Sequence, residues 1–341
     1  MSTSPAASRP DAPAWCIDSG PDDLEEGLFG QVVLWTFELL PHLTRQAVRP
    51  AWAIRSRLYG AAPGFLVLPG VFDLAYTPTP AAGRATRRTR MLALRVRAVS
   101  VLGGNWPALN ALWQAHFRVP QRILAQADAV ALPPGTLGLH YRGTDKNQTP
   151  LDTNPVAVDD FFTLARAFLA EHPELHTVFL ATDDPAALQG VEQGLAGRRV
   201  INLGPVSFHK GPRHDADRAD RALLDCVLLS RCAAVLKCSS ALSGFAKVLN
   251  PSLACYRVSA SKMFGDVPYF PDAHVPRLQL QDAAAQAILA RQFEGDWLDD
   301  PRVPARFREV FTSLPRHSPV QVLVNWLKYR MSVLLGRPRK A

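Results

Sequence analysis

The stretch TLGLHYRGTDK, residues 136–146, decides how the rest of the chain is interpreted. It follows Pro133-Pro134-Gly135 and begins with an apolar run, which predicts a buried strand over 136–141. The strand runs directly into four ionisable groups within seven residues, namely His140, Arg142, Asp145 and Lys146. A buried strand that ends in such a cluster is typical of the ligand-binding edge of an α/β sheet.

Strand and helix patterns alternate on the carboxyl side of this stretch. Apolar β-prone runs predict further strands over 177–181, 199–203, 234–237 and 253–258. Helical patterns lie between them, over 159–171, 185–195, 216–232 and 241–249. This alternation predicts an α/β fold in which helices cover a parallel sheet. Ligands of such sheets bind beyond the carboxyl ends of the strands, so the residues after each strand are candidates for a site.

The first candidate strand end is the cluster of His140, Arg142, Asp145 and Lys146. An arginine grips a phosphate through two parallel N–H bonds, and a lysine adds a point charge. The cluster therefore indicates an anion site, with Arg142, Asp145 and Lys146 as candidate catalytic residues. An ion pair between Arg142 and Asp145 is the structural alternative.

Two carboxylates follow the next predicted strand, in the sequence VFLATDDP over 178–185. Asp184 precedes a proline and suits the N-terminal cap of the following helix. Asp183 is then free to accept hydrogen bonds from hydroxyl or amine groups of a ligand. Both are candidate ligand-binding residues, with capping as the alternative for Asp184.

The third strand end carries Ser239 and Ser240 in front of the helix over 241–249. Hydroxyls and free backbone N–H groups at a helix N-terminus form an anion site suited to a pyrophosphate. Ordinary serine capping is the alternative. Asp225 is a further candidate, because it interrupts an apolar helix and a buried carboxylate needs a partner. Arg221, one turn back, and a donor group of a ligand are the two candidate partners.

Other motifs point away from metal chemistry. Asp215-Ala216-Asp217 matches the DxD pattern of metal-dependent sugar transferases, but it precedes a helix rather than ending a strand. We therefore interpret it as part of a helix start. The sequence contains no HExxH, Walker or GxGxxG pattern. We expect no metal and no bound cofactor.

The 341 residues suit two domains with terminal extensions. We expect a disordered N-terminus, a first domain, a second domain with the alternating strands and helices, and a helical extension, over 1–14, 15–130, 131–275 and 276–341. In the first domain, a strand is predicted over 15–18, and one helix over 106–130 with an interruption at Pro120.

The C-terminal extension ends in an amphipathic segment. The apolar residues of 320–335 fall on one helical face, and three basic residues follow, namely Arg337, Arg339 and Lys340. This pattern fits two arrangements. The segment either makes peripheral contact with an anionic membrane surface on its inner face, or packs on the first domain.

Composition sets the remaining limits. A hydrophobic content of 48% and a charged content of 20% are typical of a globular enzyme. The five cysteines lack CxxC spacing, and four lie in apolar runs, which favours reduced thiols and a cytoplasmic location. The net charge of +8 suits an anionic partner. No zinc-finger or RNP-type motif accompanies this charge, so nucleic acid is not expected.

Three of these segments together resemble the core α1,6-fucosyltransferase family and its rhizobial chitooligosaccharide-fucosylating relatives. HYRGTDK over 140–146 is similar to the H-x-R-R-T-D-K signature of that family. VFLATDDPAAL over 178–188 resembles its second motif, and 223–240 resembles its third. The three segments keep the order of the family, whereas the first domain and the C-terminal region show no comparable match.

The resemblance implies a GT-B-like architecture, with two Rossmann-like domains whose parallel sheets face a cleft. The domain over 15–130 would then be the acceptor-side domain, and the domain over 131–275 would bind the nucleotide sugar. It implies metal-independent, inverting transfer of fucose from GDP-fucose to a glycan hydroxyl. His140 and Arg142 would then hold the diphosphate. Asp183, Asp225 and Ser240 would contact the nucleotide.

Two residues depart from the pattern of the family. Gly143 stands in place of the second arginine, so one phosphate contact is missing or comes from elsewhere. Pro150 stands in place of a glutamate that would serve as the acceptor base. Asp145, and after it Asp152, are the nearest replacements.

Two alternative functions stay open at this point. The first is the same fold acting on another nucleotide sugar, because no residue above recognises the sugar itself. The second is a catalytically inert protein that binds a nucleotide sugar or a glycan, which the departures at Gly143 and Pro150 motivate. The acceptor, for which a lipid-linked or surface-polysaccharide precursor is one candidate, does not follow from the sequence.

Overall fold

The structure is a computed structural model of the whole chain. It describes residues 14–19, 27–56, 58–59, 65–80, 86–90, 104–143, 155–195, 197–204, 216–260 and 274–293.

A five-stranded parallel sheet forms the second half of the chain. Its strands are β6 (Thr136–Tyr141), β7 (Thr177–Thr182), β8 (Arg199–Asn202), β9 (Ala234–Lys237) and β10 (Ala254–Arg257). They lie side by side in the order β10-β9-β6-β7-β8. Strands are therefore added first on one side of β6 and then on the other. This is the doubly wound order, and it leaves a crevice between the carboxyl ends of β6 and β9.

Helices cover both faces of this sheet. One face packs against α6 (Val158–Glu171), α7 (Pro185–Gly194) and α10 (Ala283–Phe293). The other face packs against α8 (Ala216–Ser230) and α9 (Ala241–Leu249). The central strands β6, β7 and β9 are buried along their whole length and are therefore rich in apolar residues, whereas the edge strands β8 and β10 are partly exposed. The sequence predicted all five strands within one residue of their bounds.

The first half of the chain contains a smaller parallel sheet. Its strands are β1 (Trp15–Asp18), β2 (Ala51–Arg55) and β4 (Arg87–Arg90), in the order β2-β1-β4. Two short strands, β3 (Asp73–Leu74) and β5 (Phe117–Arg118), form an antiparallel pair. The helical segments are η1 (Leu28–Val33), α1 (Leu34–Arg45), α2 (Val67–Gly70), α3 (Trp106–Gln114) and α4 (Gln121–Val130).

The predicted helix over 106–130 is thus two helices, α3 and α4, with β5 between them. Phe117 and Arg118 pair with β3, and Pro120 takes an extended conformation in front of α4. The chain changes direction between α3 and α4, because Phe117 and Arg118 pair with β3 instead of continuing the helix.

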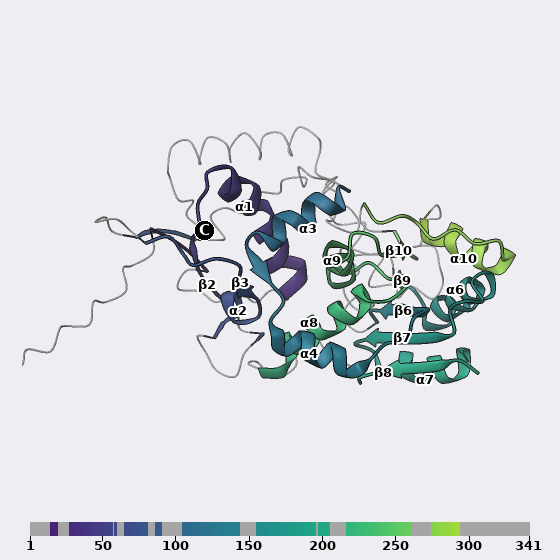
Figure 1. The fold of residues 1–341 in the computed structure, drawn as a ribbon. Coiled ribbons are helices and arrows are strands. Elements are labelled where there is room, and N and C mark those ends of the chain that lie inside the picture. Colours follow the sequence, from purple (N-terminus) through teal and green to yellow (C-terminus); the bar gives the residue numbers. More distant parts are fainter. Residues whose placement is uncertain are drawn as a thin grey trace, which may run out of the picture.

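The two halves share a continuous hydrophobic core. The helices α8 and α9 lie between the large sheet and the first half of the chain (Figure 1), where α4 packs on α8 and α3 on α9. At the centre, the ring of Phe245 on α9 lies 4.9 Å from that of Trp113 and 5.6 Å from that of Phe29. Arg122 on α4 adds two hydrogen bonds, of 2.9 and 2.7 Å, to the carboxylate of Asp220 on α8.

The α/β class with parallel sheets is therefore confirmed. The domain boundaries at 130 and 275 stay predictions, as does a cleft between two sheets. The segments over 1–13 and 294–341, which include the amphipathic stretch 320–335, lie outside the described residues.

All five cysteines are free thiols, and Cys226, Cys232, Cys238 and Cys255 are buried. Burial raises the pKa of Cys232 well above its ordinary value, so this thiol stays protonated and packs as a small apolar group. None of the helices in the described part of the chain has the length and apolar character needed to span a bilayer.

The shared core predicts that truncation of one central ring weakens both halves together. Phe245→Ala should lower the free energy of unfolding by about 3–5 kcal/mol, the usual loss for a buried phenylalanine. The unfolding curve in urea, followed by tryptophan fluorescence and by circular dichroism, should keep a single transition at lower denaturant concentration. Two separate transitions, of which only one moves, would contradict a common core.

Candidate functional site

The carboxyl ends of β6 and β9 carry polar residues that the sequence singled out. His140, the last residue but one of β6, lies next to Lys237 at the end of β9, and these two residues are partners in the register of the two strands. Lys237 is in turn the register partner of Arg257 on β10. Three basic residues thus form a row across neighbouring strands.

Side-chain alternation places His140 and Lys237 on the face of the sheet covered by α8 and α9, whereas the guanidinium of Arg257, on the edge strand, lies 5.6 Å from the ring of Phe293 on α10. Leu236 and Cys238, the neighbours of Lys237, belong to the core with α6, α7 and α10, so Lys237 points to the opposite face. Lys237 is fully buried. The sequence analysis did not select it; the signal it left is a lysine at the end of an otherwise apolar strand.

His140 lies on the same face and contacts α9. Its Nδ1 is 2.7 Å from the Oγ of Ser243, in the first turn of that helix. Burial, and after it the charges of Arg142 and Lys237, lower the pKa of His140 well below its ordinary value. His140 is therefore neutral at pH 7 and contributes hydrogen bonding rather than charge.

Arg142 is held by Asp183, from the end of the neighbouring strand β7. The Nε of Arg142 lies 2.9 Å from Oδ2 of Asp183, and the backbone N–H of Gly143 donates to Oδ1 of the same carboxylate at 2.9 Å. Asp183 has no exposed side-chain surface. The prediction that Asp183 is free is therefore wrong, because its two oxygens contact Arg142 and the N–H of Gly143. Whether it also contacts a nucleotide stays a prediction.

The N-terminus of α9 lies at the same edge of the sheet, with three residues between it and the end of β9 at Lys237. Ser240 is the N-cap residue, with an extended backbone, and its hydroxyl makes no capping hydrogen bond to the helix. Ser239 and Ser240 are both buried. Ordinary capping, the alternative considered for these serines, is thus not what the hydroxyl of Ser240 does.

Asp184, in contrast, caps a helix. Its Oδ1 accepts a hydrogen bond of 2.9 Å from the N–H of Ala186 in the first turn of α7.

Asp184 also explains why residue 143 is a glycine. A Cβ built on Gly143 would collide with the Asp184 carboxylate, and would approach the Asp184 Cβ to 2.8 Å and the ring of Tyr141 to 2.6 Å. The packing here leaves no room for a second arginine.

Asp225 lies in the buried part of α8 with Arg221 as its partner. The Nε of Arg221 is 3.5 Å from Oδ1 of Asp225, and Arg221 also donates to the carbonyl of Gly204 at 3.1 Å. Burial raises the pKa of Asp225 to about 7, although Arg221 acts in the opposite direction. Arg221, one of the two candidate partners from the sequence, is therefore present beside Asp225.

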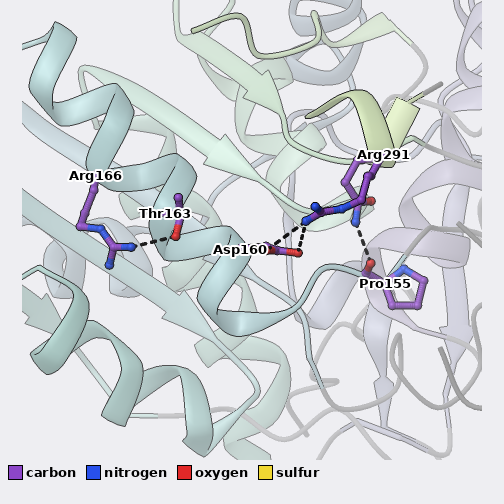
Figure 2. Close-up of polar contacts among 6 residues, drawn as sticks. Pro155, Asp160, Thr163, Arg166 and Arg291 are labelled. Carbon is purple, nitrogen blue, oxygen red and sulfur yellow. Dashed lines mark hydrogen bonds and ion pairs between the residues drawn. The ribbon is translucent and has the colours of Figure 1, made fainter. Parts of the chain in front are cut away.

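Polar contacts join α10 to α6 and to Pro155 in front of it. Asp160, in the first turn of α6, lies 3.3 Å from Arg291 of α10, and Figure 2 shows these two side chains facing each other. Gln292 donates a hydrogen bond of 3.0 Å to the carbonyl of Pro155. These contacts fix the start of α6 against α10.

Several predicted residues lie outside the described ones: Asp145, Lys146, Pro150, Asp152 and Asp215. Asp217 is exposed in the first turn of α8, where its charge suits the positive end of the helix. Among the residues that the structure describes, no group of three or more His, Cys, Asp or Glu side chains has the arrangement of a metal site.

Comparisons with known proteins give only weak likenesses. No family model matches the chain. No curated protein matches it either. Among solved structures, NodZ α-1,6-fucosyltransferase soaked with GDP-fucose is 17% identical, with 70% of this chain and 94% of that chain covered and a TM-score of 0.44. The apo form of POFUT1 is 10% identical, with 74% and 99% covered and a TM-score of 0.44. Scores this low carry no argument about activity, which rests on the site itself.

The raised pKa of Asp225 predicts an unusual pH dependence of stability. Because the folded state favours the neutral carboxyl group, its contribution is fully present below the ordinary pKa of 3.8 and is lost as the pH rises to about 7. The wild-type protein should therefore lose stability relative to Asp225→Asn between pH 5 and pH 8, by up to about 1.4 kcal/mol per pH unit. Urea unfolding of both proteins across this range measures the difference.

Asp220→Asn, on the same helix but at a half-exposed position, is the matched control. Its stability relative to the wild type should change little over the same range. A difference between wild type and Asp225→Asn that does not vary with pH would contradict the burial of this carboxyl group.

Proposed function

We propose that this protein is a glycosyltransferase that moves fucose from GDP-fucose to a hydroxyl group of a glycan. The observation that carries the proposal is the arrangement of Arg142. At the carboxyl end of β6, its Nε lies 2.9 Å from Oδ2 of Asp183, and the neighbouring strand β9 ends in the buried Lys237 and is followed by α9. The resemblance to the α1,6-fucosyltransferase family implies that His140 and Arg142 hold the diphosphate of the donor.

The chemistry of the site suits a diphosphate. Arg142 supplies a planar group of N–H donors, Lys237 adds positive charge, and the first N–H groups of α9 face the same edge. Because His140 is neutral, it tunes the site by hydrogen bonding with Ser243 and does not add a third charge. The whole arrangement is preorganised, so little has to move when negative charge develops on a leaving diphosphate.

In the proposed reaction, the acceptor hydroxyl attacks the anomeric carbon as the bond to the β-phosphate breaks. Arg142 and the N-terminus of α9 stabilise the charge on the departing phosphate oxygen, and Lys146 assists them. A carboxylate takes the proton of the attacking hydroxyl, and Asp145 is the preferred candidate, followed by Asp152. Attack from the face opposite the leaving group inverts the configuration at that carbon.

The two alternatives are separated by turnover and by nucleotide preference. A catalytically inert binding protein would bind GDP-fucose but release no GDP in the presence of a glycan acceptor. The same fold with another donor would bind UDP or CMP sugars in preference to GDP-fucose.

We further propose that the acceptor is a lipid-linked glycan in the cytoplasm, with 320–341 in contact with the inner membrane surface. Sedimentation with anionic vesicles before and after deletion of 320–341 tests that contact.

Arg142→Ala should be less stable than the wild type, because it removes the charge partner of the buried Asp183. The folded variant should bind GDP more weakly and lose about 100- to 1000-fold in kcat, the usual effect of removing one donor to a developing negative charge. Arg142→Lys should restore little, because a point charge does not reproduce the planar group. GDP release with a glycan acceptor and calorimetric titration with GDP measure the two effects.

Arg122→Ala is the matched control, since Arg122 is a half-exposed arginine that pairs with Asp220 outside the strand-end cluster. It should keep GDP affinity and turnover. Wild-type affinity and activity in Arg142→Ala would remove the basis of the proposed donor site.

Turnover should also survive chelation. Arg142, Lys237 and the N-terminus of α9 provide the positive charge that a divalent ion supplies in metal-dependent transferases. We therefore expect the same rate of GDP release with and without excess EDTA. Loss of activity that magnesium or manganese restores would be the opposite result, and would direct attention to Asp215 and Asp217.

A further inference from the structure

Ser259 occupies the strand end next to the proposed donor site. It follows β10 by two residues, and the hydrogen bond of 3.0 Å from the N–H of Val258 to the carbonyl of Lys237 continues the pairing of β10 with β9 beyond the strand. Arg257 is the register partner of Lys237. Two residues further on, Ser259 therefore lies beside Ser239.

Ser259 belongs to the same edge of the sheet as two residues of the proposed site. Arg142 follows β6, Ser239 follows β9 and Ser259 follows β10, and these three strands are neighbours in the sheet. Parallel strands bring their carboxyl ends to one edge. Arg142, Ser239 and Ser259 thus lie beyond three neighbouring strand ends.

The hydroxyl of Ser259 is buried without a hydrogen-bond partner. The residue has no exposed surface, and its Oγ makes no hydrogen bond to any part of the structure that is described. Other buried serines behave differently: the hydroxyl of Ser230 donates to the carbonyl of Val227 at 2.6 Å, and that of Ser243 contacts His140. A buried polar group without a partner is rare, because it loses its bonds to water and gains none.

The backbone around Ser259 is held in place, so a loose segment does not explain the missing partner. Val258 is bonded to Lys237 on one side, and on the other the N–H of Ala260 donates to the carbonyl of Gln292 at 3.4 Å. The side chain of Gln292 donates a hydrogen bond to the carbonyl of Pro155. Gln292 of α10 thereby contacts both Ala260 and Pro155.

We propose that Ser259 is a donor-binding residue, whose hydroxyl donates a hydrogen bond to a phosphate oxygen of the nucleoside diphosphate. This inference rests on the proposed function and extends its site by one strand, from Arg142 over Ser239 to Ser259. Neighbouring strands lie about 4.8 Å apart, so two adjacent hydroxyls reach different oxygens of one diphosphate. Ser259 then supplies part of the phosphate contact that the second arginine of the family signature would make and that Gly143 does not make.

The test compares Ser259→Ala with Ser230→Ala in the full-length protein. Ser259→Ala removes no hydrogen bond from the free protein, so its urea midpoint should equal or exceed that of the wild type. Its affinity for GDP in calorimetric titration should fall about tenfold or more, as for loss of a hydrogen bond to a charged group. Ser230→Ala should show the reverse, with lower stability and unchanged GDP affinity. Ser259→Cys, which keeps the volume but donates weakly, should lose affinity like the alanine variant.

Titration with inorganic pyrophosphate identifies the bonded group. Loss of affinity for both GDP and pyrophosphate in Ser259→Ala supports the phosphate contact, whereas loss for GDP alone overturns it in favour of a contact to the nucleoside. If Arg142→Ala weakens GDP binding and neither Ser259 variant does, the inference fails and the proposed function stands. If the wild-type protein binds no nucleoside diphosphate, the proposed function fails as well.

Discussion

The carboxylate of Asp183 holds together the edge of the sheet on which the proposed chemistry depends. It joins the ends of β6 and β7 by accepting from the backbone of Gly143 and pairing with Arg142, both at 2.9 Å. Because Asp183 is buried, solvent screens this pairing little, and the pairing fixes the orientation of Arg142 at the strand end. In the proposed function, this ion pair positions the group that binds the phosphate, and it is weak evidence for stability by itself.

The same constraint explains the departure at Gly143. The turn that brings the N–H of residue 143 onto Asp183 also brings its Cα against Asp184 and Tyr141, and a side chain has no space there. Positive charge is instead contributed by Lys237, from the adjacent strand end. A site of this kind can keep its charge while changing which strand supplies it, because parallel strands bring their carboxyl ends to one edge.

The local sequence was sufficient to predict the strands and helices of the second half, since buried parallel strands such as Thr136–Tyr141 read as apolar runs between helical segments. It also located the three polar strand ends. It did not predict the strand order. It therefore predicted neither the register of His140 with Lys237 nor the pairing of Asp183 with Arg142. In the first half, the pairing of β5 with β3 overrode the helical pattern over 106–130. Contacts between segments distant in the chain decided each of these features.

The proposed function requires a nucleoside diphosphate to bind at the carboxyl ends of β6, β9 and β10, against the N-terminus of α9. Hydrogen–deuterium exchange with and without saturating GDP tests it most directly, because bound phosphate occupies the backbone N–H groups that this claim names. We predict slower exchange in peptides that span 140–143 and 238–243, with little change over β1, β2 and α3. Protection confined to the first half of the chain, with none at these strand ends, would contradict the account.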